Sequence, residues 1–286
     1  MSGVGVIMGY ALRESLRRRV FVVVLVLTVG FLGLYGVGSW RVFRDTESFA
    51  RQASRAGVDT DTLAGSNMFG LAMFATLFLG CVLAVFLTLG AVRGDAERGL
   101  LQPLVVRPIG RSTLMLGRFA GAATVCAGYV LFLFVSSLVI TGLVGGWWPD
   151  RVFAPALGLM LGVCIIAAIG LLGSVQLSGT ANGIAIFMVF GAGLVAGLLG
   201  QIGNAIESPT LEDVSRVATW LLPFEALYQS GLSALTADVT GATEQVVSLG
   251  PFGGAASAGP LIWIWSAIYL GVVGVATLFA FRRRDL

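Results

Sequence analysis

The sequence predicts an all-α, polytopic membrane protein with six transmembrane helices. Its mean hydropathy is +0.92, and 57% of the 286 residues are hydrophobic whereas only 12% are charged. Soluble domains carry about 25% charged residues. Six apolar runs are each long enough to cross a bilayer, which takes roughly 20 residues. We therefore treat residues 1–286 as a single transmembrane domain.

The composition also excludes several classes of active site. Every basic residue is Arg, because the sequence contains neither Lys nor His. A P-loop requires Lys, and a Ser-His-Asp triad or an imidazole metal site requires His. Cys81, Cys126 and Cys164 lie within apolar runs and at no metal-ligand spacing. We expect no catalytic residue, no metal site, no nucleotide-binding site and no nucleic-acid partner.

The N-terminal stretch 1–19 predicts an amphipathic helix on the membrane surface. Apolar residues recur at steps of three and four from Val4 to Leu16. The candidates for contact with anionic headgroups are Arg13, Arg17, Arg18 and Arg19. The alternative is a plain cluster of Arg that orients the first span.

The predicted spans share an apolar run bounded by polar or turn-forming residues. They cover residues 20–38, 67–92, 113–144, 152–174, 182–201 and 260–281. Residues 41–66 carry both charge signs and are not expected to cross the bilayer. The third span is longer than a bilayer requires, so its first turns, with Arg118, are expected to extend beyond the membrane as a rigid helix.

The external segment 202–259 contains one ambiguous apolar stretch. Trp220 to Leu235 reads WLLPFEALYQSGLSAL, which Pro223, Glu225 and Gly231 interrupt. It is too short and too interrupted to span. A re-entrant or interfacial helix and an ordinary amphipathic surface helix both fit it. The Gly-, Ala-, Ser- and Thr-rich residues 236–259 predict a loop.

Charge asymmetry predicts the orientation. With the termini, the 93–112 segment and the protruding first turns of the third span, which carry Arg118, on one side, that side holds twelve Arg and four acids, and the other side holds six Arg and eleven acids. The net charges of +8 and −5 add up to the net +3 of the chain. By the positive-inside rule we expect both termini to lie in the cytoplasm. We expect the chain to span the inner (cytoplasmic) membrane of the cell.

The membrane interior is expected to lack charge. No predicted span has an ionisable residue at its middle, which argues against an ion-coupled secondary transporter. A solvated surface explains the external acids Glu207, Glu212, Asp213 and Glu225 better than a catalytic site does. Glycine pairs four residues apart predict close helix packing, and these are Gly117 with Gly121, Gly158 with Gly162 and Gly193 with Gly197.

The segment from Gly94 to Arg118 is a charged interruption between two apolar runs. One apolar face is formed by Leu100, Leu101, Leu104 and Val105, and it is flanked by Glu97, Arg98 and Arg107. Such a face suits a groove on a soluble partner. Pro103 requires either two short pieces or a helix that starts near it. An idle polar loop on the membrane surface is the alternative.

This segment resembles the cytoplasmic loop of ABC transporter permeases of the second exporter type. The matching residues are Glu97, Gly99, Leu101, Leu104, Pro108, Arg111, Gly117 and Arg118. Leu100 stands where the family often has Thr, and Arg118 where it often has Lys. The similarity covers the whole topology but is specific only in this segment.

The resemblance implies the membrane subunit of an ATP-driven exporter. The 93–112 segment would dock on a separate ABC ATPase through Glu97, Arg98, Leu100, Leu101, Leu104, Arg107, Pro108 and Arg111. That partner would bind ATP and Mg²⁺, and the permease would pair with a second copy or a related permease. Residues 1–19 would form the elbow helix. Short helices before the last span would supply external gate candidates, namely Trp220, Pro223, Phe224 and Glu225.

Two other functions stay open. The long external segment is large enough to bind an external protein, as an assembly subunit that transmits force across the membrane would require. A secondary transporter is the remaining possibility. The sequence does not identify the transported substrate.

Overall fold

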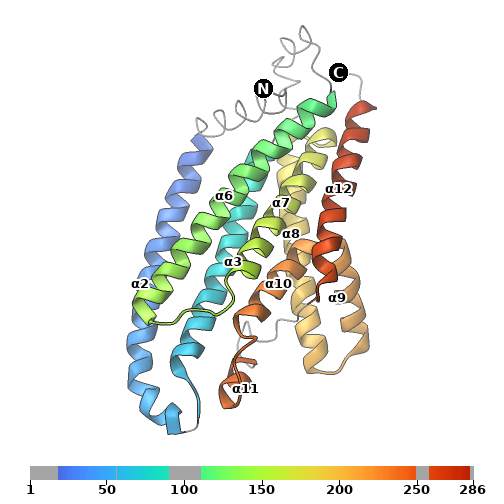
Figure 1. Ribbon diagram of the computed structural model, residues 1–286. Helices are drawn as coiled ribbons and strands as arrows, with labels where there is room; N and C mark the ends of the chain where they lie inside the picture. Colours follow the sequence, from blue (N-terminus) through green and yellow to red (C-terminus); the bar gives the residue numbers. More distant parts are fainter. Residues whose placement is uncertain (1–18, 56, 90–110, 249–257, 284–286) are drawn as a thin grey trace.

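The computed structural model describes residues 19–55, 57–89, 111–248 and 258–283. In these ranges all regular structure is α-helical (Figure 1). The helices are α2 (Arg19–Arg55), α3 (Thr60–Thr88), α6 (Arg111–Gly145), α7 (Phe153–Gln176), α8 (Gly179–Ala205), α9 (Pro209–Leu221), α10 (Pro223–Leu235), α11 (Ala242–Ser248) and α12 (Leu261–Arg282). The predicted helix at residues 1–19 lies outside the described residues, apart from Arg19 at the start of α2.

Six of these helices are long and apolar enough to cross a membrane, which confirms the predicted all-α, polytopic fold. Their apolar stretches are Val22–Thr46, Thr60–Thr88, Ser112–Gly145, Phe153–Gln176, Gly179–Asn204 and Leu261–Arg282. The starts of α2 and α6 and the end of α12 lie at one end of the bundle, which we name the arginine end (Figure 1). The α2–α3 connection and α11 lie at the opposite end, which we name the far end.

Helix α2 is longer than the sequence predicted. The expected span ended at residue 38, but the helix continues to Arg55. The charged residues after 38 change the hydropathy without breaking the helix, because no Gly or Pro occurs between Gly38 and Gly57. The backbone of Gly57 adopts φ 72°, and Asp59 then caps α3 by accepting from the backbone N–H groups of Asp61 and Thr62. The predicted span therefore forms only the first part of a longer helix.

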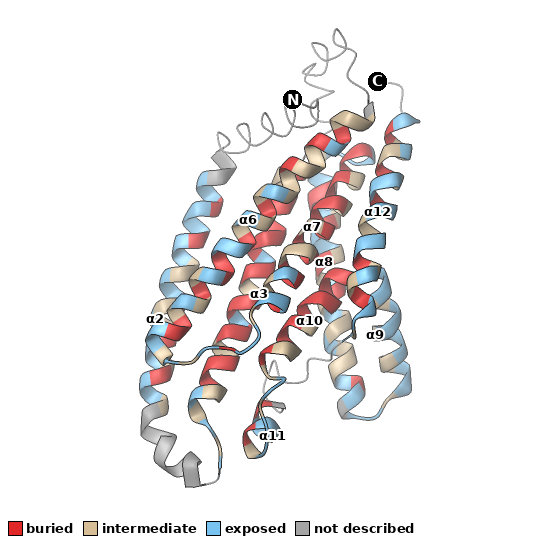
Figure 2. Cartoon of the chain, in the orientation of Figure 1, coloured by how far each residue is buried: buried red, intermediate tan, exposed pale blue. Residues whose placement is uncertain are grey.

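Helices α3 and α7 form the centre of the bundle. α3 packs against α2, α6 and α7, and α7 also contacts α8, α10 and α12. Figure 2 shows buried residues concentrated on α3, α7 and α10, whereas α2, α9 and α12 expose much of their surface. The exposed side chains of α2 and α12 are largely apolar, as the hydrocarbon of a bilayer requires.

Two hydrogen bonds between side chains join α2 to α6. The hydroxyls of Tyr35 and Thr141 lie 2.5 Å apart and are buried, and those of Thr28 and Tyr129 lie 2.7 Å apart. Both threonines also donate to the carbonyl one turn earlier in their own helix. These hydroxyls therefore join two helices as well as satisfying their own backbone.

The connections at the far end contain more structure than expected. Residues 236–259 were predicted to be a loop, yet they include the seven-residue helix α11. Arg151, in the α6–α7 connection, makes two hydrogen bonds to the carboxylate of Asp238, at 2.6 and 3.0 Å. Thr243 of α11 accepts a bond from the backbone N–H of Asp59. These contacts tie the α10–α11 connection and α11 to the rest of the far end.

Candidate functional site

The segment that we predicted to be external folds back into the bundle as a re-entrant hairpin of α9 and α10. α9 returns from the far end alongside α8, and α10 runs outward again against α7 (Figure 1). The chain reverses at Leu222, with φ −128° and ψ 67°. Pro223 begins α10, where the missing N–H of proline costs no intrahelical bond. Each helix has 13 residues, or about 20 Å of length, too short to span.

The two helices of this hairpin differ sharply in burial. No described side chain of α9 is buried, whereas nine of the thirteen residues of α10 are. A surface helix therefore fits α9, but it does not fit α10. The apolar stretch Trp220–Leu235 is divided at Leu222 into the end of an exposed helix and a helix packed inside the protein.

Glycines of α7 and α8 allow α10 to approach closely. A methyl group added at Gly158 would lie 3.1 Å from the carbonyl oxygen of Leu227, and one at Gly162 would lie 3.4 Å from that of Phe224. On α8, a methyl group at Gly193 would lie 2.5 Å from the Phe224 ring. The predicted glycine pairs on α7 and α8 therefore mark close packing, and the helix that packs against them is α10 of the hairpin.

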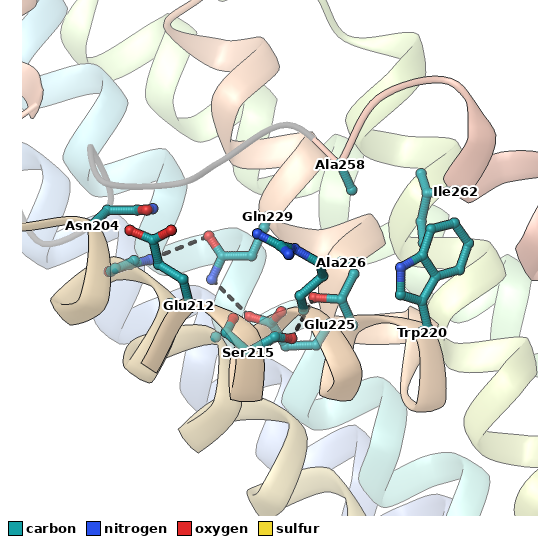
Figure 3. A pocket seen from close by; sticks show the side chains of 14 residues that line it. Asn204, Glu212, Ser215, Trp220, Glu225, Ala226, Gln229, Ala258 and Ile262 are labelled. Atoms are coloured by element: carbon teal, nitrogen blue, oxygen red, sulfur yellow. Dashed lines mark hydrogen bonds between the residues drawn. The ribbon is translucent and has the colours of Figure 1, made fainter. Parts of the chain in front are cut away.

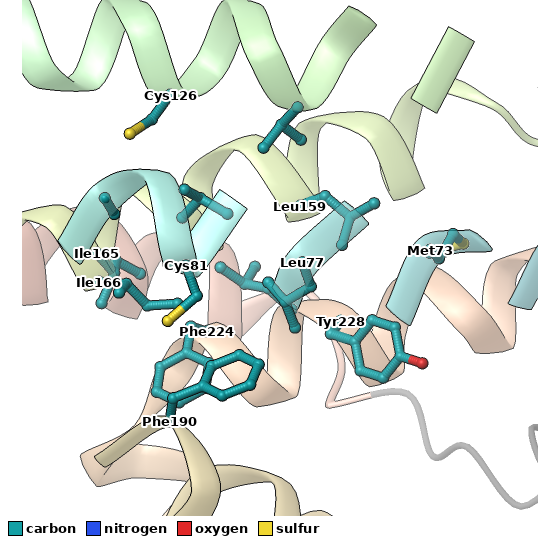
Figure 4. Packing of buried hydrophobic residues seen from close by; sticks show 14 of the residues in the cluster. Met73, Leu77, Cys81, Cys126, Leu159, Ile165, Ile166, Phe190, Phe224 and Tyr228 are labelled. Atoms are coloured by element: carbon teal, nitrogen blue, oxygen red, sulfur yellow. The ribbon is translucent and has the colours of Figure 1, made fainter. Parts of the chain in front are cut away.

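Phe224 anchors the tip of the hairpin. It is fully buried and stacks on Phe190 of α8, with ring centroids 5.9 Å apart and an interplanar angle of 14°. Figure 4 shows both rings beside Cys81 and Leu77 of α3. Burial of an aromatic side chain of this size contributes about 2–3 kcal/mol. Phe224 therefore acts as a core residue in this conformation.

Glu225 follows Phe224 and carries a carboxylate into the protein interior. Its side chain is only 5% exposed, and Gln229 Nε2 donates to its Oε1 at 2.7 Å. Gln201 Nε2 of α8 donates in turn to Gln229 Oε1 at 3.2 Å. Burial raises the pKa of Glu225 to about 7, while the hydrogen bond from Gln229 lowers it. The solvated surface that we predicted for Glu225 is therefore wrong.

A cavity of about 400 Å³ opens beside this carboxylate, between α8, α9, α10 and the start of α12. Figure 3 shows Glu225, Gln229, Glu212 and Ser215 on one side, and Trp220 with Ile262 on the other. Further lining groups include Gln201, Asn204, Arg216 and Thr219. The cavity combines carboxylates, amides and hydroxyls with one indole ring, so its side-chain lining is mainly polar.

Trp220 is held in place by α12. Its backbone carbonyl accepts a hydrogen bond of 2.8 Å from Trp265 Nε1. The two indole rings meet edge to face, with centroids 5.7 Å apart. Trp220 is the last but one residue of α9, so this contact fixes the end of α9 against the final span. The cavity wall therefore depends on α12 as well as on the hairpin.

The predicted residues fall into three groups. Glu97, Arg98, Leu100, Leu101, Leu104, Arg107 and Pro108 lie outside the described residues, as do Arg13, Arg17 and Arg18. Arg111 and Arg19 are the first residues of α6 and α2. Of the four gate candidates, Trp220 and Glu225 line the cavity, whereas Pro223 and Phe224 are buried in the packing of α10.

Sequence reasoning missed Gln229 and did not connect Gln201 with the hairpin. Glu225 and Gln229 stand four residues apart, so they share one face of a helix and can bond to each other. Pro223, two residues before Glu225, is a helix-start signal. Together these two features could have predicted the pair. The contact with Gln201 is a tertiary contact that spacing does not show.

The described residues contain no group of three or more His, Cys, Asp or Glu side chains placed to hold a metal ion. Among curated proteins, none matches the chain. Residues 6–286 match the family model described as ABC-2 family transporter protein. That match covers nearly the whole chain and agrees with the six apolar helices. The chain is therefore a membrane protein of the ABC-2 transporter family, a permease of an ABC transporter.

Proposed function

We propose that this chain is the permease subunit of an ATP-driven exporter and that a separate ABC ATPase binds the nucleotide and Mg²⁺. The family match supports this proposal. So does the absence of Lys, because the chain cannot form a P-loop of the usual kind. Two copies, or one copy and a related permease, would assemble with two ATPase subunits in the inner membrane.

The observation that carries the coupling proposal is the continuity of α6. It begins at Arg111, directly after the 93–110 part of the proposed docking segment, and runs unbroken for 35 residues. That length is about 52 Å, compared with about 30 Å of hydrocarbon. A rigid helix of this length carries a displacement at the docking segment into the core, where α6 packs on α3 and α7.

The places where the helices begin and end support the proposed orientation. The starts of α2 and α6 and the end of α12 share the arginine end, and these positions are Arg19, Arg111 and Arg282. We place this end in the cytoplasm by the positive-inside rule. The hairpin and its cavity then lie on the outer side. ATP-driven tilting of α6 would change the packing beneath them.

The alternatives receive less support. An ion-coupled transporter needs a buried charge, and Glu225 supplies one, contrary to our expectation. However, the side chains next to it toward the arginine end are the apolar rings of Phe224 and Phe190, whereas the amides Gln229 and Gln201 lead toward the far end. An external binding partner would have only part of the external segment available, because α10 is packed inside.

Affinity purification tests the proposal. The full chain is purified in mild detergent with a nonhydrolysable ATP analogue, alongside the variants Glu97→Arg and Leu101→Asp. We expect a P-loop ATPase to copurify with the native chain and to be lost in both variants. Glu244→Arg is the control, because Glu244 is exposed on α11 at the far end, so it should retain the ATPase.

Two results would contradict the proposal. If no ATPase copurifies in any condition, the chain functions without one. If the ATPase copurifies equally with all variants, the exporter assignment stands but the 93–112 segment is not its docking site.

A further inference from the structure

The cavity beside the hairpin is lined by a buried carboxylate. This carboxylate belongs to Glu225, and among the described residues the hydrogen-bond donor to it is the neutral amide of Gln229. Glu212 contributes a second carboxylate to the same wall. A buried ionised carboxylate without a cationic partner is costly, and such groups are retained where a ligand or a proton completes them.

One basic side chain, that of Arg216, lines the same cavity. Its Nη1 donates to Asp213 at 3.1 Å, and both side chains are about two-thirds exposed, so this guanidinium is solvated whereas the carboxylate of Glu225 is buried. α8 and α12 line the cavity with uncharged residues, and α7 meets this part of α10 through Gly158 and Gly162. The described residues therefore present two carboxylates and one solvated guanidinium to the cavity.

We propose that this cavity binds an organic ammonium group, with Glu225 as its counter-ion and the indole ring of Trp220 as its aromatic wall. Carboxylates together with an indole ring recognise protonated or quaternary ammonium by charge and by cation–π attraction. The ammonium group would belong either to a free amphipathic amine or to the headgroup of a lipid. The claim that the bound ammonium compound is transported rests on the proposed function. The claim that the cavity binds an ammonium group does not.

Two other occupants fit the cavity less well. A metal ion of the Ca²⁺ type takes six to eight oxygen ligands at close range, and the described residues contain no cluster of acidic side chains placed for it. A proton in transit would need polar groups on both sides of Glu225. Instead, Phe224 and Phe190 close the side toward the arginine end. A volume of about 400 Å³ is within the range of small-molecule sites.

The pH dependence of binding follows from the groups around Glu225. The other titratable or charged groups nearby are Glu212 and Arg216 from α9 and Tyr228 from α10. Burial and the charge of Glu225 raise the pKa of Tyr228, so it stays neutral near pH 7. Because its pKa is raised to about 7, Glu225 is mostly ionised at pH 8 and mostly protonated at pH 6.

Equilibrium dialysis of the purified full chain tests this inference without the ATPase. The probe is radiolabelled benzyltrimethylammonium, whose charge does not change with pH, in micelles of an uncharged maltoside detergent. We expect saturable binding at pH 8 that weakens about tenfold at pH 6. Glu225→Gln should weaken it about thirtyfold or more and remove the pH dependence. Glu244→Gln removes an exposed acid on α11 and should bind like the native chain.

A second pair of variants and a lipid arm complete the test. Trp220→Leu should weaken binding about threefold or more, and Trp220→Phe should restore part of the loss. Phosphatidylethanolamine added to the micelles should compete with the probe if the natural ligand is a lipid headgroup, whereas phosphatidylglycerol should not. Competition by neither lipid indicates a free amine. The thermal unfolding temperature of each variant shows whether it is folded.

The inference fails if the native chain shows no saturable binding at pH 8. It also fails if folded Glu225→Gln binds the probe as tightly as the native chain. Either result leaves the exporter proposal untouched, because the copurification of the ATPase is measured separately.

Discussion

The carboxylate of Glu225 in α10 lies directly against the backbone of Gly197 in α8. A methyl group on Gly197 would overlap Oε1 and Cδ of that carboxylate. The nearest atoms are the head of the side chain, which is also held by Gln229. The absence of a side chain at Gly197 is therefore what allows an acidic residue to be buried at this depth, about 10 Å along α8 from Asn204.

Gly197→Ala should consequently destabilise the protein. The added methyl group forces α8 and α10 apart or displaces the carboxylate, which typically costs about 1–3 kcal/mol. The measurement is the thermal unfolding temperature in detergent. Gly191→Ala, on the same helix, is the matched control, since a methyl group there would meet no other atom within 4 Å. Equal unfolding temperatures for both variants would show that α10 does not pack here.

Phe224→Ala should leave a cavity between α3, α8 and α10. Truncation of a fully buried Phe costs about 3–5 kcal/mol, so we expect a lower unfolding temperature and less folded protein in the membrane. Phe153→Ala is the control, because Phe153 is 91% exposed. If Phe224→Ala instead kept native stability and altered transport alone, Phe224 would be a gate residue whose packing does not stabilise the fold.

Stability should depend on pH through Glu225. Its pKa is raised from 4.5 to about 7 in the folded protein, so the folded state binds the proton more tightly than the unfolded state. The stabilisation is complete below pH 4.5 and is lost as the pH rises to 7, by about 3 kcal/mol at most.

Comparison with Glu225→Gln isolates this effect, because the amide keeps the shape and does not titrate. We expect the unfolding temperature of the variant to exceed that of the native chain by more at pH 8 than at pH 5. A difference that is the same at both values would mean that Glu225 is solvated and titrates normally.

The hydrogen bond between Tyr35 and Thr141 should stabilise the contact of α2 with α6. A double-mutant cycle with Tyr35→Phe and Thr141→Val measures it, and we expect a coupling energy of about 0.5–1.5 kcal/mol in unfolding. Thr124, whose hydroxyl bonds to the carbonyl of Ala120 in its own helix, replaces Thr141 in a control cycle. That cycle should give no coupling with Tyr35.

Apolar runs predicted the spans well because helices in hydrocarbon must satisfy their own backbone and show apolar side chains to lipid. The same reasoning does not show where a helix ends after it leaves the membrane. At the end of α2, helix formers continue after Ser39 although the side chains become charged, so hydropathy alone did not show the full length of the helix. α11 was missed because seven residues carry too little periodicity.

The site could be predicted only in part. Trp220 and Glu225 were singled out, and the glycine pairs of α7 and α8 were recognised as packing surfaces. The sequence could not show that these glycines pack against α10. Gly162 and Gly197 lie 35 residues apart, and they contact neighbouring residues of α10, Phe224 and Glu225. Burial of Glu225 depends on that tertiary contact, so its charge alone suggested a solvated surface.

The hairpin also constrains how the protein is made. α9 and α10 follow α7 and α8 in the sequence and precede α12, and in the folded protein α10 packs against α7, α8, α9 and α12. α9 and α10 are too short to span the bilayer by themselves. We therefore expect α10 to dock on α7 and α8 after those two helices have inserted into the membrane. The start of α12 then covers the remaining side. Translation of α12 thus completes the wall of the cavity, and a nascent chain arrested before α12 would hold an unfinished site.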